Sequence, residues 1–189
     1  MNLPNRLTIV RILLTFVFLF FAFQAGVISK VVALVVFLFA SLTDFCDGYY
    51  AKKYNLISDF GKIMDPIADK FLVLTAFFIF MMVHLVQTWM FLAILAREVI
   101  VTFVRLQAMR RGIILAAEQA GKIKTVLQIV AIVAILIFMI FAEMNLPGHW
   151  SARLGQFYRG ISYLMLAVVA VTLFSGVSFL WNNRRSIHA

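Results

Sequence analysis

The acidic residues of this sequence are concentrated in one short segment. The chain has 189 residues and only eight aspartates and glutamates, yet five of these lie between Thr43 and Lys70. They are Asp44, Asp47, Asp59, Asp65 and Asp69. In a chain that is 64% hydrophobic, ionised carboxylates are costly unless they are paired, hydrated in a cavity or bound to cations. The segment is therefore the first candidate for a functional site.

Four of these carboxylates would converge if the segment formed two antiparallel helices. Asp44 and Asp47 are three residues apart and would share one helical face. Asp65 and Asp69 are four apart and would do the same. Four converging carboxylates need counter-charge, and hard divalent cations supply it, with room for two ions ~3.5–4 Å apart. Asp59 falls outside both faces, and we expect it to be a solvated charge in a loop.

Two small residues accompany the first pair of aspartates. Gly48 and Ala51 fall on the same helical stripe as Asp44 and Asp47. Small residues at such spacing are common where membrane helices pack closely. Beside four acids we favour the other interpretation, in which they leave room for a bound ligand.

The composition predicts an all-α integral membrane protein. Twenty phenylalanines and 64% hydrophobic residues are more apolar surface than a soluble domain of this size can bury. A soluble helical protein with a large core is the alternative, which the lengths of the apolar runs disfavour. Because no linker, repeat or cleavable signal is visible, we expect one domain over residues 1–189. Six runs approach the ~20 residues that cross a bilayer, at 7–28, 30–51, 65–84, 88–110, 122–142 and 159–182.

Basic residues predict the orientation of these six transmembrane helices. Most of the 17 lysines and arginines would share one side with both termini, whereas Lys30, Arg153 and Arg159 lie toward the other. By the positive-inside rule both termini are cytosolic. The net charge of +9 then reflects topology and contact with anionic lipids or phosphates rather than nucleic acid. We expect a multi-pass protein of the inner (cytoplasmic) membrane.

In this topology the acidic pairs lie just below the cytosolic surface. The apolar part of the second run, Val31–Leu42, and that of the third, Phe71–Val83, are each too short to cross a bilayer alone. Both helices must therefore continue through the turns that carry the aspartates. A site at this depth would be open to the bilayer and to the cytosol together.

The spacing of these residues resembles the motif of a known family, the CDP-alcohol phosphotransferases. These are integral membrane enzymes that join a CDP-activated donor to an alcohol and release CMP. The family usually has arginine where this chain has Lys52, and lysine keeps the charge but loses the bidentate fork. The matching residues, with eight residues between the two halves, are Asp44-x-x-Asp47-Gly48-x-x-Ala51-Lys52 and Gly61-x-x-x-Asp65-x-x-x-Asp69.

The resemblance implies a role for each residue of the motif. Asp44, Asp47 and Asp65 would be ligands of two divalent ions, Mg²⁺ or Mn²⁺. Asp69 would be the base for the attacking hydroxyl and would share a metal. The family also implies a homodimer. The residues that would border the CDP moiety are Gly48, Ala51, Lys52 and Gly61.

Further segments indicate the substrates. "NLPNRLTIVRILL", "AREVIVTFVR" and "AGKIKT" resemble family members that use CDP-diacylglycerol as donor and sn-glycerol 3-phosphate as acceptor. The active site would then face the cytosol, where the soluble acceptor is found.

An acceptor that carries a phosphate needs a basic pocket. We expect Arg105, Lys122 and Lys124 to form it, with Arg11 and Arg97 as weaker candidates. The two lysines serve equally well as anchors of topology. Arg105 is harder to explain in that way, because it lies inside an apolar helix, where charges are usually functional.

Other functions stay open at this point. Cardiolipin and phosphatidylinositol-type synthases share the same motif and differ in the acceptor. An ion-coupled transporter also carries intramembrane acids, although these acids lie at one edge of the membrane and no run is broken by Gly or Pro at its middle. A structural membrane subunit would have no use for four unpaired acids.

We predict that Asp→Asn at Asp44, Asp47, Asp65 or Asp69 removes most of the CMP release expected of this family. Asparagine keeps the shape but loses the charge and basicity that metal binding and proton transfer require. The matched control is Asp59→Asn, which should keep activity near that of the wild type. Equal losses in all five purified variants would show that the spacing selected the wrong acids.

Overall fold

Six α-helices make up the described chain. The computed structural model describes residues 3–54, 59–111, 119–144 and 150–188, and the side chains of residues 8–43, 70–111, 119–144 and 155–184. No strand occurs in these ranges, so the all-α prediction is confirmed for them. The helices are α1 (Leu3–Phe23), α2 (Val27–Tyr54), α3 (Asp59–Met82), α4 (Thr88–Arg110), α5 (Gln119–Glu143) and α6 (Trp150–His188).

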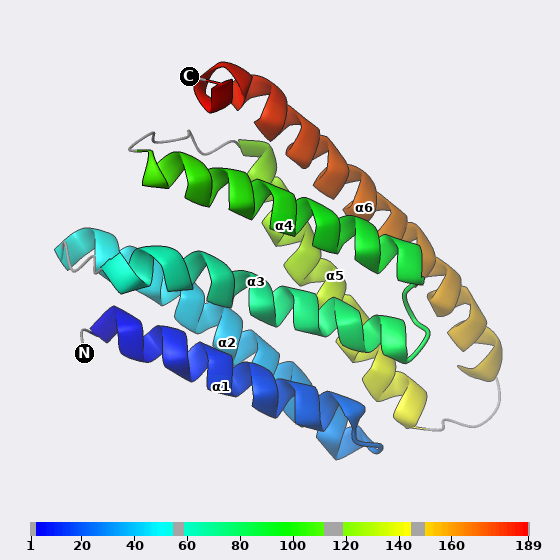
Figure 1. Ribbon diagram of the computed structural model, residues 1–189. Coiled ribbons are helices and arrows are strands. Elements are labelled where there is room, and N and C mark those ends of the chain that lie inside the picture. The colour runs from blue at the N-terminus through cyan, green and yellow to red at the C-terminus, as the bar shows by residue number, and fades with distance from the viewer. Residues whose placement is uncertain (1–2, 55–58, 112–118, 145–149, 189) are drawn as a thin grey trace.

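The helices run back and forth as an antiparallel bundle (Figure 1). The two chain termini lie at the same end, where α1, α3 and α5 begin and α2, α4 and α6 end. α1 packs against α2 and α3, α5 against α2 and α6, and α4 against α6 and α3. Fully buried aromatic and branched side chains fill the centre, among them Phe18, Phe37, Phe77, Ile94 and Ile135.

The turn between α1 and α2 ends the first helix earlier than its apolar run suggested. The run extends to residue 28, but α1 ends at Phe23. Gly26 follows with a φ of +100°, a backbone conformation that favours glycine. The Lys30 ammonium donates to the carbonyl oxygens of Ala22 and Gln24 at 2.7 and 2.8 Å and so caps the end of the helix. The prediction of residue 28 as the boundary was wrong because hydrophobicity does not report backbone geometry.

The connection between α2 and α3 is shorter than expected. The second apolar run ends at residue 51 and the third begins at 65, but α2 continues to Tyr54 and α3 begins at Asp59. The placement of Asp59 in a loop was therefore wrong, because it is the first residue of a helix. Polar residues continue the backbone hydrogen bonds of a helix after the apolar run has ended.

Apolar side chains cover the outside of the bundle as well as its interior. Phe103, Phe174 and Trp181 leave 62%, 70% and 64% of their surface exposed. Large exposed apolar patches are rare on soluble monomers and mark contact with lipid or with other molecules. This surface supports the prediction of a membrane protein.

The predicted number of transmembrane helices is supported only in part. Over the described residues, Gln119–Glu143 and Gly155–Arg184 are long and apolar enough to cross a bilayer. α4 has 23 residues but carries Arg97, Glu98 and Arg105. Six complete transmembrane helices therefore remain a prediction. Shorter apolar helical segments are Thr8–Phe23, Val27–Thr43 and Lys70–Met82.

Candidate active site

The four aspartates of the motif lie on two neighbouring helices. Asp44 and Asp47 belong to the second half of α2, and Asp65 and Asp69 to the first half of α3. The two helices are antiparallel, so both pairs lie toward the end of the bundle that holds the termini (Figure 1). Four carboxylates at these helical positions are a donor set that suits hard divalent ions.

The side chains of the motif lie outside the part of the chain whose side chains are described. This applies to every predicted metal ligand and to the predicted CDP-binding residues Gly48, Ala51, Lys52 and Gly61, all of which have helical backbones. Among the described side chains there is no group of three or more His, Cys, Asp or Glu that would bind a metal. The metal and CDP assignments therefore stay predictions.

A basic cavity begins one residue after the last of these aspartates. Lys70, the neighbour of Asp69 in the chain, lines a cavity of about 520 Å³ whose wall is formed mainly by α3, α4, α5 and α6, with one residue each from α1 and α2. Among the described residues that line it, six are basic and one, Glu98, is acidic. A concave surface with this charge balance attracts anions. The basic residues are Arg11, Lys70, Arg97, Arg105, Lys122 and Lys124.

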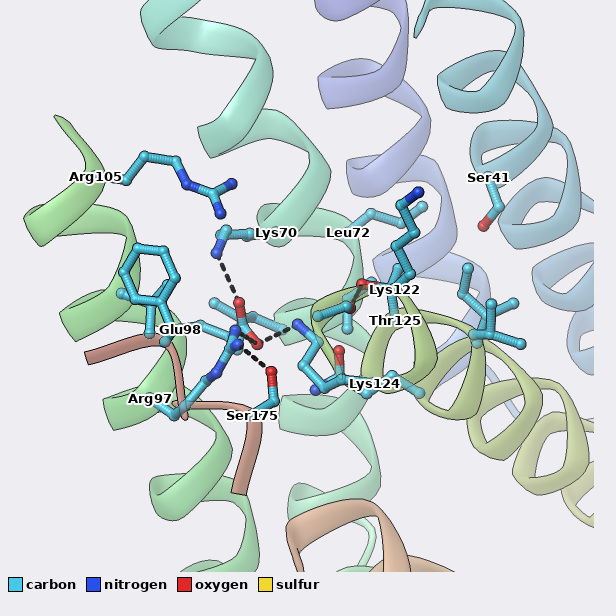
Figure 2. Close-up of a pocket in the computed structure, with 18 of the residues that line it drawn as sticks. Ser41, Lys70, Leu72, Arg97, Glu98, Arg105, Lys122, Lys124, Thr125 and Ser175 are labelled. Atoms are coloured by element: carbon cyan, nitrogen blue, oxygen red, sulfur yellow. Dashed lines mark hydrogen bonds and ion pairs between the residues drawn. The ribbon is translucent and has the colours of Figure 1, made fainter. Parts of the chain in front are cut away.

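The structure brings the predicted acceptor-binding residues to one cavity. Arg105 comes from α4, and Lys122 and Lys124 from the first turns of α5 (Figure 2). Arg105 and Lys122 are exposed, whereas Lys124 is buried. The guanidinium carbon of Arg105 lies 5.4 Å from the centre of the Phe179 ring, a cation–π contact that orients it. Arg11, a weaker candidate, is buried and lines the same cavity.

One buried carboxylate holds three of these cations. Glu98 is 2% exposed, and its Oε2 accepts from Lys70 Nζ at 2.7 Å. Its Oε1 accepts from Arg97 Nη1 at 3.1 Å and from Lys124 Nζ. Figure 2 shows the three cations reaching the carboxylate from different sides. A buried charge is tolerated when it is paired and hydrogen-bonded in this way.

The sixth helix fixes the arginine of this cluster. Arg97 Nη2 donates to Ser175 Oγ at 2.8 Å. A Cβ atom at Gly176 would lie 2.8 Å from Arg97 Cγ, so only glycine leaves space for the side chain there. Ser175 and Phe179 also line the cavity. α6 therefore forms one wall of the site, although its sequence shows no motif.

The sequence analysis missed Lys70 and Glu98 as members of the site. Lys70 was only one of the many basic residues that set the topology, and Glu98 was given no role. The signal was present, because Glu98 is an acid within an apolar helix and such a residue requires cationic partners. The sequence does not say which of its many cations those partners are.

Comparisons with known proteins agree with the geometry. A family model of CDP-alcohol phosphatidyltransferases matches residues 1–177. The chain is 38% identical to a CDP-diacylglycerol–glycerol-3-phosphate 3-phosphatidyltransferase of Bacillus subtilis, over 72% of this chain and 77% of the relative. It is 34% identical to a probable phosphatidylglycerophosphate synthase of Mycobacterium tuberculosis, over 98% of this chain and 83% of the relative. A Rickettsia typhi protein with the same name as the Bacillus relative is 38% identical, over 69% and 74%.

We predict that Gly176→Ala destabilises the protein by disturbing Arg97. The new methyl group would meet Arg97 Cγ near its fixed base, not at its mobile tip. Overpacking of this kind costs about 1–3 kcal/mol, which exceeds the ~1 kcal/mol that alanine gains over glycine in a helix. The control is Gly160→Ala on the same helix, where nothing lies within 4 Å. Thermal unfolding in detergent should give a lower midpoint for Gly176→Ala only, and equal midpoints would contradict the clash.

Proposed function

The chain belongs to the CDP-alcohol phosphatidyltransferase family, and we therefore propose that it transfers a phosphatidyl group from CDP-diacylglycerol to sn-glycerol 3-phosphate, in phospholipid biosynthesis. The products are phosphatidylglycerophosphate and CMP. Several relatives carry the name of this activity. The single structural observation that carries the proposal is the cavity with six basic residues beside the turn that holds Asp69. It suits an acceptor with a phosphate better than an uncharged alcohol.

The acceptor is bound through its phosphate. Arg105, Lys122 and Lys124 meet the phosphate oxygens, as charge-assisted hydrogen bonds favour. This contact directs the free hydroxyl of glycerol 3-phosphate toward the aspartates at the start of α3. Lys124 keeps N–H donors for this purpose after pairing with Glu98, because an ammonium group has three.

The reaction is a displacement at the β-phosphorus of the donor. The acceptor oxygen forms a bond to that phosphorus while the bond to the CMP oxygen breaks, and Asp69 accepts the hydroxyl proton. Gly48, Ala51, Lys52 and Gly61 border the CDP moiety, with Lys52 close to its diphosphate. Two Mg²⁺ or Mn²⁺ ions would be held by Asp44, Asp47, Asp65 and Asp69. When bound, these ions would neutralise the charge of the diphosphate.

The protein is proposed to be a single domain that crosses the cytoplasmic membrane six times. The apolar outer surface of the bundle and the common end of both termini support this arrangement. The cluster of basic residues at that end would face the cytosol. The lipid donor then reaches the site from the bilayer and the acceptor from the cytosol. We further propose that the enzyme works as a homodimer.

A panel of acceptors tests the proposal directly. Purified enzyme with CDP-diacylglycerol and Mg²⁺ is offered sn-glycerol 3-phosphate, glycerol, inositol or phosphatidylglycerol, and CMP release is measured. Glycerol 3-phosphate should react much faster than the others, and chelation of the divalent ion should abolish the reaction. If uncharged alcohols react as well, the acceptor assignment fails while membership of the family stands. Full turnover in chelator would contradict the two-metal proposal.

We predict that Arg105→Ala raises the KM for glycerol 3-phosphate by about 10- to 100-fold, because a hydrogen bond to a charged group is worth ~1.5–3 kcal/mol. The KM for CDP-diacylglycerol should change little. Arg110→Ala is the matched control, since Arg110 is an exposed arginine of the same helix that does not line the cavity. A similar effect of both variants would mean that Arg105 acts only through general surface charge.

A further inference from the structure

The carboxylate of Glu98 is placed where a ligand-binding cavity would ordinarily have none. It is the acidic member of the described lining and is more deeply buried than either lysine it pairs with. A negative charge in an anion-binding cavity repels an anion and so weakens the long-range attraction that the cations exert on it. Its presence beside six cations therefore needs a reason that outweighs this cost.

The reason lies in how the lysines are held. Lysine is a flexible side chain that loses much rotamer freedom when it is fixed. Lys70 on α3 and Lys124 on α5 each give one N–H donor to Glu98, from different helices and to different oxygens. Each ammonium group keeps two further donors, and both residues line the cavity. Glu98 thus fixes two ammonium groups at the cavity wall and leaves N–H donors of each free to bind a ligand.

Glu98 itself is held in place by Arg97. Arg97 Nη1 donates to Glu98, and Nη2 donates to Ser175 on α6. The arginine is 9% exposed and packed against Gly176, so it cannot turn toward a ligand without losing both bonds. Arg97 therefore acts as a support of the carboxylate and not as a contact of the ligand.

We propose that Glu98 is a positioning residue that holds Lys70 and Lys124 ready for the acceptor's phosphate, and that Lys70 is a further contact of that phosphate. This inference rests on the proposed function, because it takes the cavity as the acceptor site. It predicts that loss of the negative charge weakens phosphate binding, although the cavity becomes more positive. A purely electrostatic cavity would respond in the opposite direction.

The test compares Glu98→Gln with Glu143→Gln. Glu143 is a carboxylate at the end of α5, where it accepts from the backbone N–H of Gly26 at 3.0 Å, away from the cavity lining. For Glu98→Gln the KM for glycerol 3-phosphate should rise about tenfold, or ~1.4 kcal/mol, with the KM for CDP-diacylglycerol within twofold. The inhibition constant of inorganic phosphate, measured against glycerol 3-phosphate, should rise in parallel. Glu143→Gln should leave all three constants unchanged.

Two further variants keep the test decisive. Glu98→Asp retains the charge and should restore the KM for glycerol 3-phosphate to within about threefold of the wild type. Lys70→Met changes a half-buried residue at the cavity edge and should raise the same KM about tenfold. If Glu98→Gln does not fold, Lys70→Met still tests whether the lysine that Glu98 holds contacts the phosphate.

The outcomes separate this inference from the proposed function. If Glu98→Gln lowers the melting temperature but leaves or lowers the KM for glycerol 3-phosphate and the phosphate inhibition constant, Glu98 is only structural and the inference is overturned. An unchanged KM in Lys70→Met overturns the assignment of Lys70. If the wild-type protein itself releases no CMP with glycerol 3-phosphate, the proposed function fails instead.

Discussion

The charge balance around Glu98 is the constraint on which the described site depends. One carboxylate pairs with cations from α3, α4 and α5, and Arg97 extends the connection to α6. Breaking a buried ion pair by removing one partner is costly, because the remaining charge stays buried and unpaired. Four helices are thus held in one relative arrangement by a few hydrogen bonds among otherwise interchangeable apolar contacts.

At the opposite end of the bundle, a smaller set of polar contacts also joins different helices. Lys30 caps the carbonyl oxygens at the end of α1, and Glu143 of α5 accepts the N–H of Gly26. Between the two ends, Gln128 and Thr172 form a buried polar contact of 3.4 Å from α5 to α6. Apolar packing has no direction of its own, so these polar contacts help to specify how the helices are rotated and paired.

Much of the fold could be predicted from the sequence, because the length of an apolar run reports how much of a helix faces apolar surroundings. All six runs correspond to helices. The ends of the helices could not be read in this way. α1 stops early at the turn of Gly26, and α3 starts early at Asp59, because backbone conformation and hydrogen bonding decide these points.

The candidate site, like the fold, could be predicted from the sequence only in part. Fixed spacing along one or two helices predicted the aspartate motif, a charge inside an apolar helix predicted Arg105, and the need for a basic pocket predicted Lys122 and Lys124. Contacts between helices that are distant in the sequence could not be predicted. The pairing of Glu98 with Lys70 and Lys124, and the support of Arg97 by Ser175 and Gly176, exist only once α3, α5 and α6 have packed around α4.

The position of these partners along the chain also bears on how the protein is made. A ribosome delivers α4 before Lys124 and Ser175 exist, because synthesis proceeds from the N-terminus. In a bilayer, Arg97 and Glu98 would then have, among the partners seen in the described residues, each other and Lys70 until the last two helices arrive. Incompletely paired charges in lipid are costly, so a fourth helix placed in a bilayer would have the described partners of its charges only after the sixth helix has arrived. A chain that stops before Ser175 would leave Arg97 without the hydroxyl group that α6 provides.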